Sequence, residues 1–184
     1  MNHEWLVAGF GGQGILFLGD LLARAALRQG LQTSYMPTYG VAMRGGTANC
    51  VVRLSDTTIG SPLFDEPDAA ILLNQQSFSH FLPTMQENGL IIANSSMITP
   101  ETFADSTALR VLYVPATQLA RDAAGTEQAT NMVALGAFLA AEPTLEIATL
   151  IQILDEERNP KKQELVQTNK TALQAGIAFI QGLN

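Results

Sequence analysis

The chain has 184 residues, of which 47% are hydrophobic, and this size and composition suit one globular domain rather than a disordered segment. Its formal net charge is −7 with a pI near 4.7, and no cluster of Lys and Arg stands out, which argues against binding to nucleic acid. No stretch approaches the roughly 20 consecutive apolar residues that cross a bilayer, and the start of the chain lacks the basic segment of an export signal, so we expect a soluble cytoplasmic protein with no membrane partner.

The N-terminal part is expected to form a strand, a glycine loop, a helix and a second strand. Residues 5–9, WLVAG, are a short apolar run that ends in glycine and is typical of a buried strand. Residues 14–29 are apolar nearly all round and predict a mostly buried helix, which Gly30 stops. Residues 31–36 predict the second strand, which Pro37 is expected to end.

The rest of the chain predicts further strands and then a helical C-terminal region. Strands are expected at 48–56, 69–74, 89–96 and 109–115. Helices are expected near 116–124, 128–141, 144–156 and 160–181. Because strands alternate with helices, residues 1–184 are predicted to be a single three-layer α/β/α, Rossmann-like domain with a largely parallel sheet, to which the region 48–61 can add an antiparallel strand.

The first glycine loop has the Gly-x-Gly-x-x-Gly spacing of a dinucleotide-binding fingerprint, over residues 9–14. Free N–H groups at the following helix start would face a phosphate. A nicotinamide site also needs an acidic residue about 20 positions further on to hold the ribose, and none occurs between Asp20 and Asp56. An NAD site is therefore disfavoured, while an anion site and glycines that serve only close packing both stay open.

A second glycine-rich loop, GVAMRGGTANC, spans residues 40–50 and places Arg44 beside two glycines with no acid nearby. Arginine suits phosphates and carboxylates, although a lone arginine in a loop is more often a solvated surface residue. Two such loops after successive strands would lie outside the carboxyl ends of the strands, where open α/β sheets place ligands. The predicted cofactor region or subunit interface comprises Gly11, Gly12, Gln13, Gly14, Arg44, Gly45, Gly46 and Thr47.

Several motifs together give the chain a family resemblance. In order they are AGFGGQG, YMPTYGVAMRGGTANCVVRLSD, IGSP, NMVALGAFLA (131–140) and NKTALQAG (169–176). Over essentially its whole length the chain resembles the gamma subunit of 2-oxoacid:ferredoxin oxidoreductases, and the pair GGQG and MRGGT is much more specific than a lone glycine fingerprint. The sequence departs at Val41-Ala42, where many relatives have Pro-Glu, which puts any role for an acid there in doubt.

The resemblance implies a subunit of a pyruvate, 2-oxoglutarate or 2-ketoisovalerate type enzyme. Such complexes convert a 2-oxoacid and coenzyme A to acyl-CoA, CO₂ and reduced ferredoxin, using thiamine diphosphate, magnesium and iron–sulfur clusters. The implied partners are alpha and beta subunits, often with a ferredoxin-like delta subunit, and a homodimer is open for the isolated chain. Under this resemblance the glycine loops contact coenzyme A, thiamine diphosphate or only the partner subunits.

The residues themselves restrict what this chain can contribute. The single cysteine, Cys50, is expected to be a small buried hydrophobic residue. An iron–sulfur cluster would take about four cysteine ligands, so this chain is not expected to hold one by itself. His3 and His80 are too distant in sequence to suggest zinc, and His80 is expected to be partly buried. Gly19-Asp20-Leu21 lies inside a predicted helix and is not followed by the second part of a thiamine diphosphate-binding motif. The acidic run at 65–68 is expected in a solvated loop.

We therefore expect no catalytic residue and no metal ligand in this chain, no cofactor bound by it alone, and catalysis by partner subunits. Two alternatives stay open. One is a free-standing, nucleotide-binding, Rossmann-like oxidoreductase or regulator, which rests on the glycine spacing. The other is a purely structural assembly module.

Overall fold

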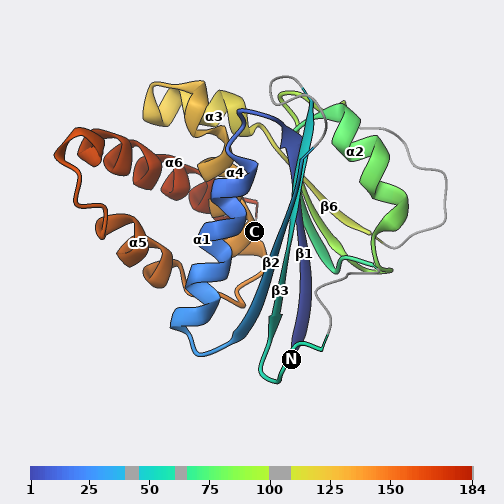
Figure 1. The fold of residues 1–184 in the computed structure, drawn as a ribbon. Helices are drawn as coiled ribbons and strands as arrows, with labels where there is room; N and C mark the ends of the chain where they lie inside the picture. Colours follow the sequence, from blue (N-terminus) through green and yellow to red (C-terminus); the bar gives the residue numbers. More distant parts are fainter. Residues whose placement is uncertain (40–45, 61–65, 100–108, 184) are drawn as a thin grey trace.

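A six-stranded mixed sheet forms the centre of the protein (Figure 1). The computed structural model describes residues 1–183 apart from 40–45, 61–65 and 100–108. The strands are β1 (Asn2–Phe10), β2 (Gln32–Tyr39), β3 (Thr47–Ser55), β4 (Ala69–Leu72), β5 (Leu90–Asn94) and β6 (Arg110–Val114). They lie in the order β2-β3-β1-β4-β5-β6.

The sheet is parallel except at β3. Strands β1, β4, β5 and β6 pair in parallel, whereas β3 is antiparallel to both β1 and β2. The connection from β2 to β3 is shorter than the dozen or more residues of a parallel crossover, so β3 returns alongside β2. The predicted parallel sheet with one antiparallel strand in the region 48–61 is therefore confirmed.

Strand β2 does not end at Pro37 as the sequence predicted. It continues to Tyr39, and Pro37 pairs in register with Cys50 of β3. β2 is the edge of the sheet, where a residue without an N–H group can be tolerated because only one side of the strand is paired.

Helices cover both faces of the sheet unequally. One face carries α1 (Ile15–Arg28), α3 (Ala116–Ala124), α4 (Thr130–Ala141), α5 (Ile147–Asp155) and α6 (Gln163–Gln181), and the other carries α2 (Gln75–Phe81) (Figure 1). The four C-terminal helices occur where predicted, with short 3₁₀ turns at η2 (Glu127–Ala129) and η3 (Pro160–Lys162), and a third turn, η1 (Leu82–Thr84), follows α2. In the part of the chain that the structure describes, no helix is long and apolar enough to cross a membrane.

Each face of the sheet has its own core. Trp5 and Val7 of β1 point into the larger cluster, under α1, α4 and α6, while Leu6 and Ala8 point into the smaller one with Phe78 of α2. This alternation is the ordinary two-residue period of a strand. β4 and β5 are buried along their whole length, as their continuous apolar runs predicted.

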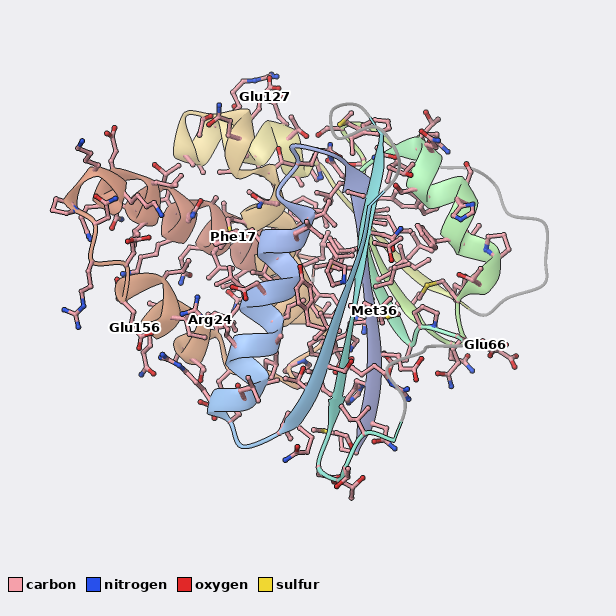
Figure 2. The ribbon with its side chains drawn as sticks, in the orientation of Figure 1. Phe17, Arg24, Met36, Glu66, Glu127 and Glu156 are labelled. Carbon is pink, nitrogen blue, oxygen red and sulfur yellow. The ribbon has the colours of Figure 1, made fainter. Side chains whose placement is uncertain are left out.

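Ion pairs on the exposed side of α1 connect it to the residue that follows α5. Arg24 and Arg28 of α1 both reach Glu156, which follows α5, and Arg24 also pairs with Asp20 at 3.7 Å (Figure 2). These side chains are largely exposed, so each pair adds little stability.

Helices α4 and α6 cross with their backbones in direct contact. A Cβ added at Gly136 would lie 2.0 Å from the carbonyl oxygen of Leu173, and one added at Gly176 would lie 1.9 Å from that of Val133. Residues 130–139 of α4 are buried, so this crossing lies at the centre of the helical layer. The motifs NMVALGAFLA and NKTALQAG meet here, and their glycines have a packing role.

A polar contact lies at the edge of the sheet where the parallel strands β1 and β4 begin. Asp68 precedes β4, and its Oδ1 accepts a hydrogen bond from the Glu4 N–H (3.3 Å). Its Oδ2 lies 2.9 Å from His3 Nδ1. The expectation of a solvated acidic loop is therefore wrong for Asp68, because pairing of β4 with β1 brings its carboxylate against the start of β1. Glu66 is exposed as expected, and Asp65 lies outside the described residues.

Replacing Gly176 by alanine should destabilise the fold. Alanine is about 1 kcal/mol better in a helix, but its Cβ would collide with the backbone of α4 rather than with a movable side chain. We expect a net loss toward the upper end of the ~1–3 kcal/mol typical of overpacking, measured by urea unfolding. The control is Gly182→Ala at the end of α6, where the Cβ meets only ordinary contacts at 3.4 Å or more. Equal unfolding midpoints for the two variants would contradict the close crossing.

The His3–Asp68 contact should make stability depend on pH. Hydrogen bonding to Asp68 raises the pKa of His3 above its ordinary value of 6.5, so the stabilisation is complete below that value and is lost as the pH rises through the folded-state pKa. His3→Gln should therefore lower the free energy of unfolding more at about pH 5.5 than at about pH 8.5. In an Asp68→Asn background the difference between the two pH values should be much smaller, because the largest cause of the raised His3 pKa is removed. A His3→Gln effect that does not vary with pH in the wild-type background would refute this assignment.

Candidate functional site

The carboxyl ends of the parallel strands form the edge of the sheet where a ligand is expected. After β1 the chain crosses to α1 on one face, and after β4 it crosses to α2 on the other (Figure 1). Helices that leave neighbouring parallel strands in opposite directions define a topological switch point, and open α/β sheets bind ligands in the crevice at that point. The first glycine loop, between β1 and α1, lies there.

The glycines of this loop have two different roles. Gly12 and Gly14 have φ values of +96° and +73°, which favour glycine over other residues. A Cβ at Gly14 would lie 2.2 Å from Asn131 Nδ2, and one at Gly9 would lie 2.6 Å from Gln13 Oε1, whereas a Cβ at Gly12 would meet no atom of the described residues within 4 Å. Gly9 and Gly14 therefore serve packing, and no described residue crowds the backbone at Gly12.

The side chain of Gln13 closes the loop on itself. Its Oε1 accepts a hydrogen bond from the backbone N–H of Phe10 (2.6 Å), and the backbone N–H of Gln13 donates to the Phe10 carbonyl (3.1 Å). Asn74 Nδ2 also donates to Gln13 Oε1 (3.4 Å), which connects the loop to the start of α2. Gln13 was predicted as a binding residue, and the contacts recorded for its Oε1 hold the loop in shape.

The two predicted glycine loops are brought together. The Gly11 N–H donates to the carbonyl of Gly46 at 2.9 Å, and Thr47 begins β3 opposite the last residue of β1. Thus Gly11, Gly12, Gln13 and Gly14 lie beside Gly46 and Thr47 at one edge of the sheet. Arg44 and Gly45 lie outside the described residues.

Asparagines at neighbouring helix starts were not predicted as part of this edge. Asn74 caps α2 by accepting the Ser77 N–H at 2.8 Å, and Asn131, near the start of α4, donates to the carbonyl of Gly14 at 3.5 Å. Both are buried, and each joins the start of one helix to the first glycine loop. Asn74 is the last residue of the predicted strand 69–74, and the preference of asparagine for the position before a helix is the signal that could have identified it.

A third asparagine, Asn94, ends β5 and is fully buried. Its Nδ2 donates to the Leu73 carbonyl (3.3 Å) and to Thr117 Oγ1 (3.0 Å), and its Oδ1 accepts the Thr117 N–H (3.4 Å). It therefore fixes the start of α3 against the end of β4. With the contacts of Asn74 and Asn131, the starts of α1, α2, α3 and α4 converge on one edge.

This edge suits a negatively charged group without supplying a metal site. Within the described parts of the chain no side chain caps α1, and the N–H groups of its first turn, which carry partial positive charge, suit a phosphate or carboxylate. Among the described residues, no group of three or more His, Cys, Asp and Glu could hold a metal ion. Asp20 of the Gly19-Asp20-Leu21 fragment points outward and pairs with Arg24.

Two further reactive side chains, Cys50 and His80, remain to be placed. Cys50 is fully buried, as predicted, and burial raises the pKa of its thiol to about 12, so it is uncharged at neutral pH. His80 is exposed rather than partly buried, because α2 turns it outward, with its ring centroid 4.6 Å from that of Phe81.

The open α/β sheet with paired glycine loops at its switch point defines a Rossmann-like class of domain. Residues 4–179 match the family model of pyruvate ferredoxin/flavodoxin oxidoreductases, and the chain belongs to this family. This match confirms the resemblance inferred from GGQG and MRGGT.

Individual relatives are subunits of 2-oxoacid:ferredoxin oxidoreductases. The chain is 38% identical over 181 residues to the ketoisovalerate oxidoreductase subunit VorA of Methanothermobacter thermautotrophicus, a match that covers 94% of this chain but 35% of that protein. It is 29% identical over 184 residues to the 2-oxoglutarate synthase subunit KorC of the same organism, covering 98% and 96% of the two chains. The chain thus spans about a third of the first relative and nearly all of the second.

Solved structures confirm the fold. The gamma subunit of a keto/oxoacid ferredoxin oxidoreductase from Geobacter sulfurreducens superposes with a TM-score of 0.83 at 25% identity, covering 99% of this chain and 98% of that one. The 2-oxoglutarate:ferredoxin oxidoreductase from Magnetococcus marinus matches with a TM-score of 0.88 at 24% identity, covering 100% of this chain and 32% of that one. The latter was solved with 2-oxoglutarate, coenzyme A and succinyl-CoA bound.

Proposed function

We propose that this chain is a gamma-type subunit or domain of a thiamine-dependent 2-oxoacid:ferredoxin oxidoreductase, and that it completes the complex without carrying catalytic groups. The complex would convert a 2-oxoacid and coenzyme A to acyl-CoA and CO₂ and pass the electrons to ferredoxin. The observation that carries the proposal is the similarity to KorC along nearly the full length of both chains. The ketoisovalerate and 2-oxoglutarate relatives support a 2-oxoacid as substrate without selecting one.

Thiamine diphosphate and iron–sulfur clusters do not fit the described residues of this chain. These residues offer no group that could hold the magnesium of thiamine diphosphate, and the only cysteine of the sequence, Cys50, is buried and protonated. We therefore assign these groups to alpha and beta subunits and to a ferredoxin-like delta subunit. No catalytic step is assigned to side chains of this chain.

A phosphate-bearing group such as coenzyme A fits the first glycine loop better. The first turn of α1, which no described side chain caps, offers N–H donors, and no described atom would meet a Cβ at Gly12 within 4 Å. The bond between Gly11 and Gly46 keeps the second loop nearby, and Arg44 is two positions before Gly46 in sequence. We propose that Gly11, Gly12, Gln13, Gly14, Arg44, Gly45, Gly46 and Thr47 form a cofactor region or interface shared with the partner subunits.

The isolated chain should show no turnover with 2-oxoacids, coenzyme A and a viologen dye. Adding it to its alpha, beta and delta partners should restore activity, and a panel of oxoacids would identify the substrate. Turnover by the purified chain alone would refute the non-catalytic role. A chain that fails to join the complex but binds NAD(H) by calorimetry would instead support the free-standing nucleotide-binding alternative.

Arg44→Ala should weaken either assembly or the use of coenzyme A. A charge-assisted contact contributes on the order of 1.5–3 kcal/mol, so its loss corresponds to roughly tenfold to a hundredfold in affinity. Arg44→Lys keeps the charge but loses the planar fork and should be impaired as well. The matched control is Arg110→Ala, an exposed arginine at the opposite, amino end of β6. If Arg44→Ala matches wild type in both measurements, the second loop serves the fold alone.

A further inference from the structure

A groove with a cavity volume of about 440 Å³ lies on the outer side of α1, between α1, α5 and α6. Helix α5 packs against both α1 and α6. Phe17 and Arg24 lie on the side of α1 that faces these two helices (Figure 2). None of the described lining residues belongs to the cofactor region proposed above, so the groove is a separate feature of the surface.

Two helices each line the groove with one face. The residues that they contribute are Phe17, Leu21 and Arg24 of α1, and Leu165, Val166 and Asn169 of α6. Positions three, four or seven residues apart share one side of a helix. From residue 17 to residue 24 the axis of α1 advances by about 10 Å. The groove is therefore long enough for about two turns of another helix.

Two large apolar side chains at the groove are exposed. Phe17 is 41% exposed and Leu165 is 52% exposed. A small molecule inside the groove would leave the outward surface of these side chains in water, whereas a protein surface laid across the groove would cover them. The exposed apolar surface therefore favours a protein partner over a small ligand.

The charged residues of the lining are paired within this chain. Lys162 Nζ lies 3.1 Å from Glu157 Oε2. Arg24 lies 3.7 Å from Glu156. The lining thus carries two cations and two anions, and it attracts neither a strongly acidic nor a strongly basic surface. A partner that fits this groove has an uncharged, apolar contact face.

Asn169 adds a requirement for a hydrogen bond. The residue is 8% exposed, and its side-chain amide has no hydrogen-bond partner among the described residues. The unpaired side-chain atoms that are sealed from solvent in the described chain belong to Trp5, Thr33 and Ser77, so the amide of Asn169 keeps accessible surface. Because Asn169 lines the groove, this amide opens into it. A partner that supplies a donor or an acceptor there relieves an unfavourable burial.

We propose that this groove binds an amphipathic helix of a partner subunit of the oxidoreductase complex. Such a helix inserts apolar side chains at i and i+4 between Phe17 and Leu165, in the helix-in-groove mode of recognition. An amide or hydroxyl side chain on the same face bonds to Asn169. The inference rests on the proposed function, which supplies the partner subunits, and it adds a contact that is separate from both glycine loops.

The first test is the dissociation constant of the full chain for the preassembled alpha–beta core. Leu165→Lys should raise this constant at least about tenfold, because it places a charge in an apolar contact. Leu27→Lys is the matched control, since Leu27 is 59% exposed on α1 and is not among the described lining residues. The control should stay within about twofold of wild type.

Asn169→Leu separates recognition from folding. It should raise the dissociation constant about fivefold, because the partner loses its hydrogen bond. It should leave or raise the melting temperature of the free chain, because it removes an unpaired amide from a mostly apolar site. Wild-type affinity in both Leu165→Lys and Asn169→Leu refutes the groove while the proposed function stands. A wild-type chain that does not bind the core refutes the proposed function and this inference together.

Cysteine labelling locates the contact directly. The only native cysteine, Cys50, is buried and protonated, so an added cysteine can be labelled selectively. Leu165→Cys should react with a maleimide in the free chain and be protected in the complex, whereas Ser79→Cys, at an exposed position of α2, should react in both. Protection of Leu165→Cys in the isolated chain, together with a dimer that Leu165→Lys abolishes, would place a second copy in the groove and overturn the proposal.

Discussion

The antiparallel insertion of β3 between β1 and β2 is the constraint from which the candidate site follows. Because β3 runs opposite to β1, its first residue lies beside the last residue of β1. This pairing places residue 46 against residue 11, and the hydrogen bond between them joins two loops that are far apart in sequence. Had β3 been parallel to β1, its start would lie at the other edge of the sheet and the loops would be separated by the length of a strand.

Several glycines of this fold allow close packing between elements. At Gly136 and Gly176 two helices touch, and at Gly14 the start of α1 meets Asn131 near the start of α4. Since α4 also packs against α6, the position of the glycine loop is connected through Asn131 to the centre of the helical layer. A motif that looks like a ligand fingerprint in the sequence is therefore partly a packing motif, although no described residue crowds Gly12.

The elements predictable from the sequence are those that depend on local pattern alone. β4 and β5 are continuous apolar runs and are buried on both faces. Pro37 was wrongly taken as the end of β2, because the edge position that tolerates it is a property of the sheet and not of the segment. The helix α2 was missed because it is short and buries few side chains, with Ser77 and Phe78 as its buried residues. Asp68 was misplaced because its partner, His3, is 65 residues away.

The candidate site was predictable only as two separate loops. The spacing of the glycines located each loop after a strand, but no local pattern could show that Gly11 bonds to Gly46. The role of Asn94 was equally hidden, since a buried asparagine needs partners from two other elements, Leu73 and Thr117, to be satisfied. Sequence motifs thus identified the segments, and tertiary pairing decided which of their atoms remain available.

The charge of the chain limits how such an edge can hold an anion. A net charge of −7 repels a phosphate at long range, and the described side chains recorded at this edge are amides and hydroxyls rather than cations. Among the described residues, attraction comes from short-range donors, namely the N–H groups at the start of α1, whose effect fades within about one turn. Apart from the contact proposed for Arg44, such donors favour a group that is delivered and held by other contacts. A subunit that completes a site formed largely by its partners fits this balance better than an independent anion-binding protein.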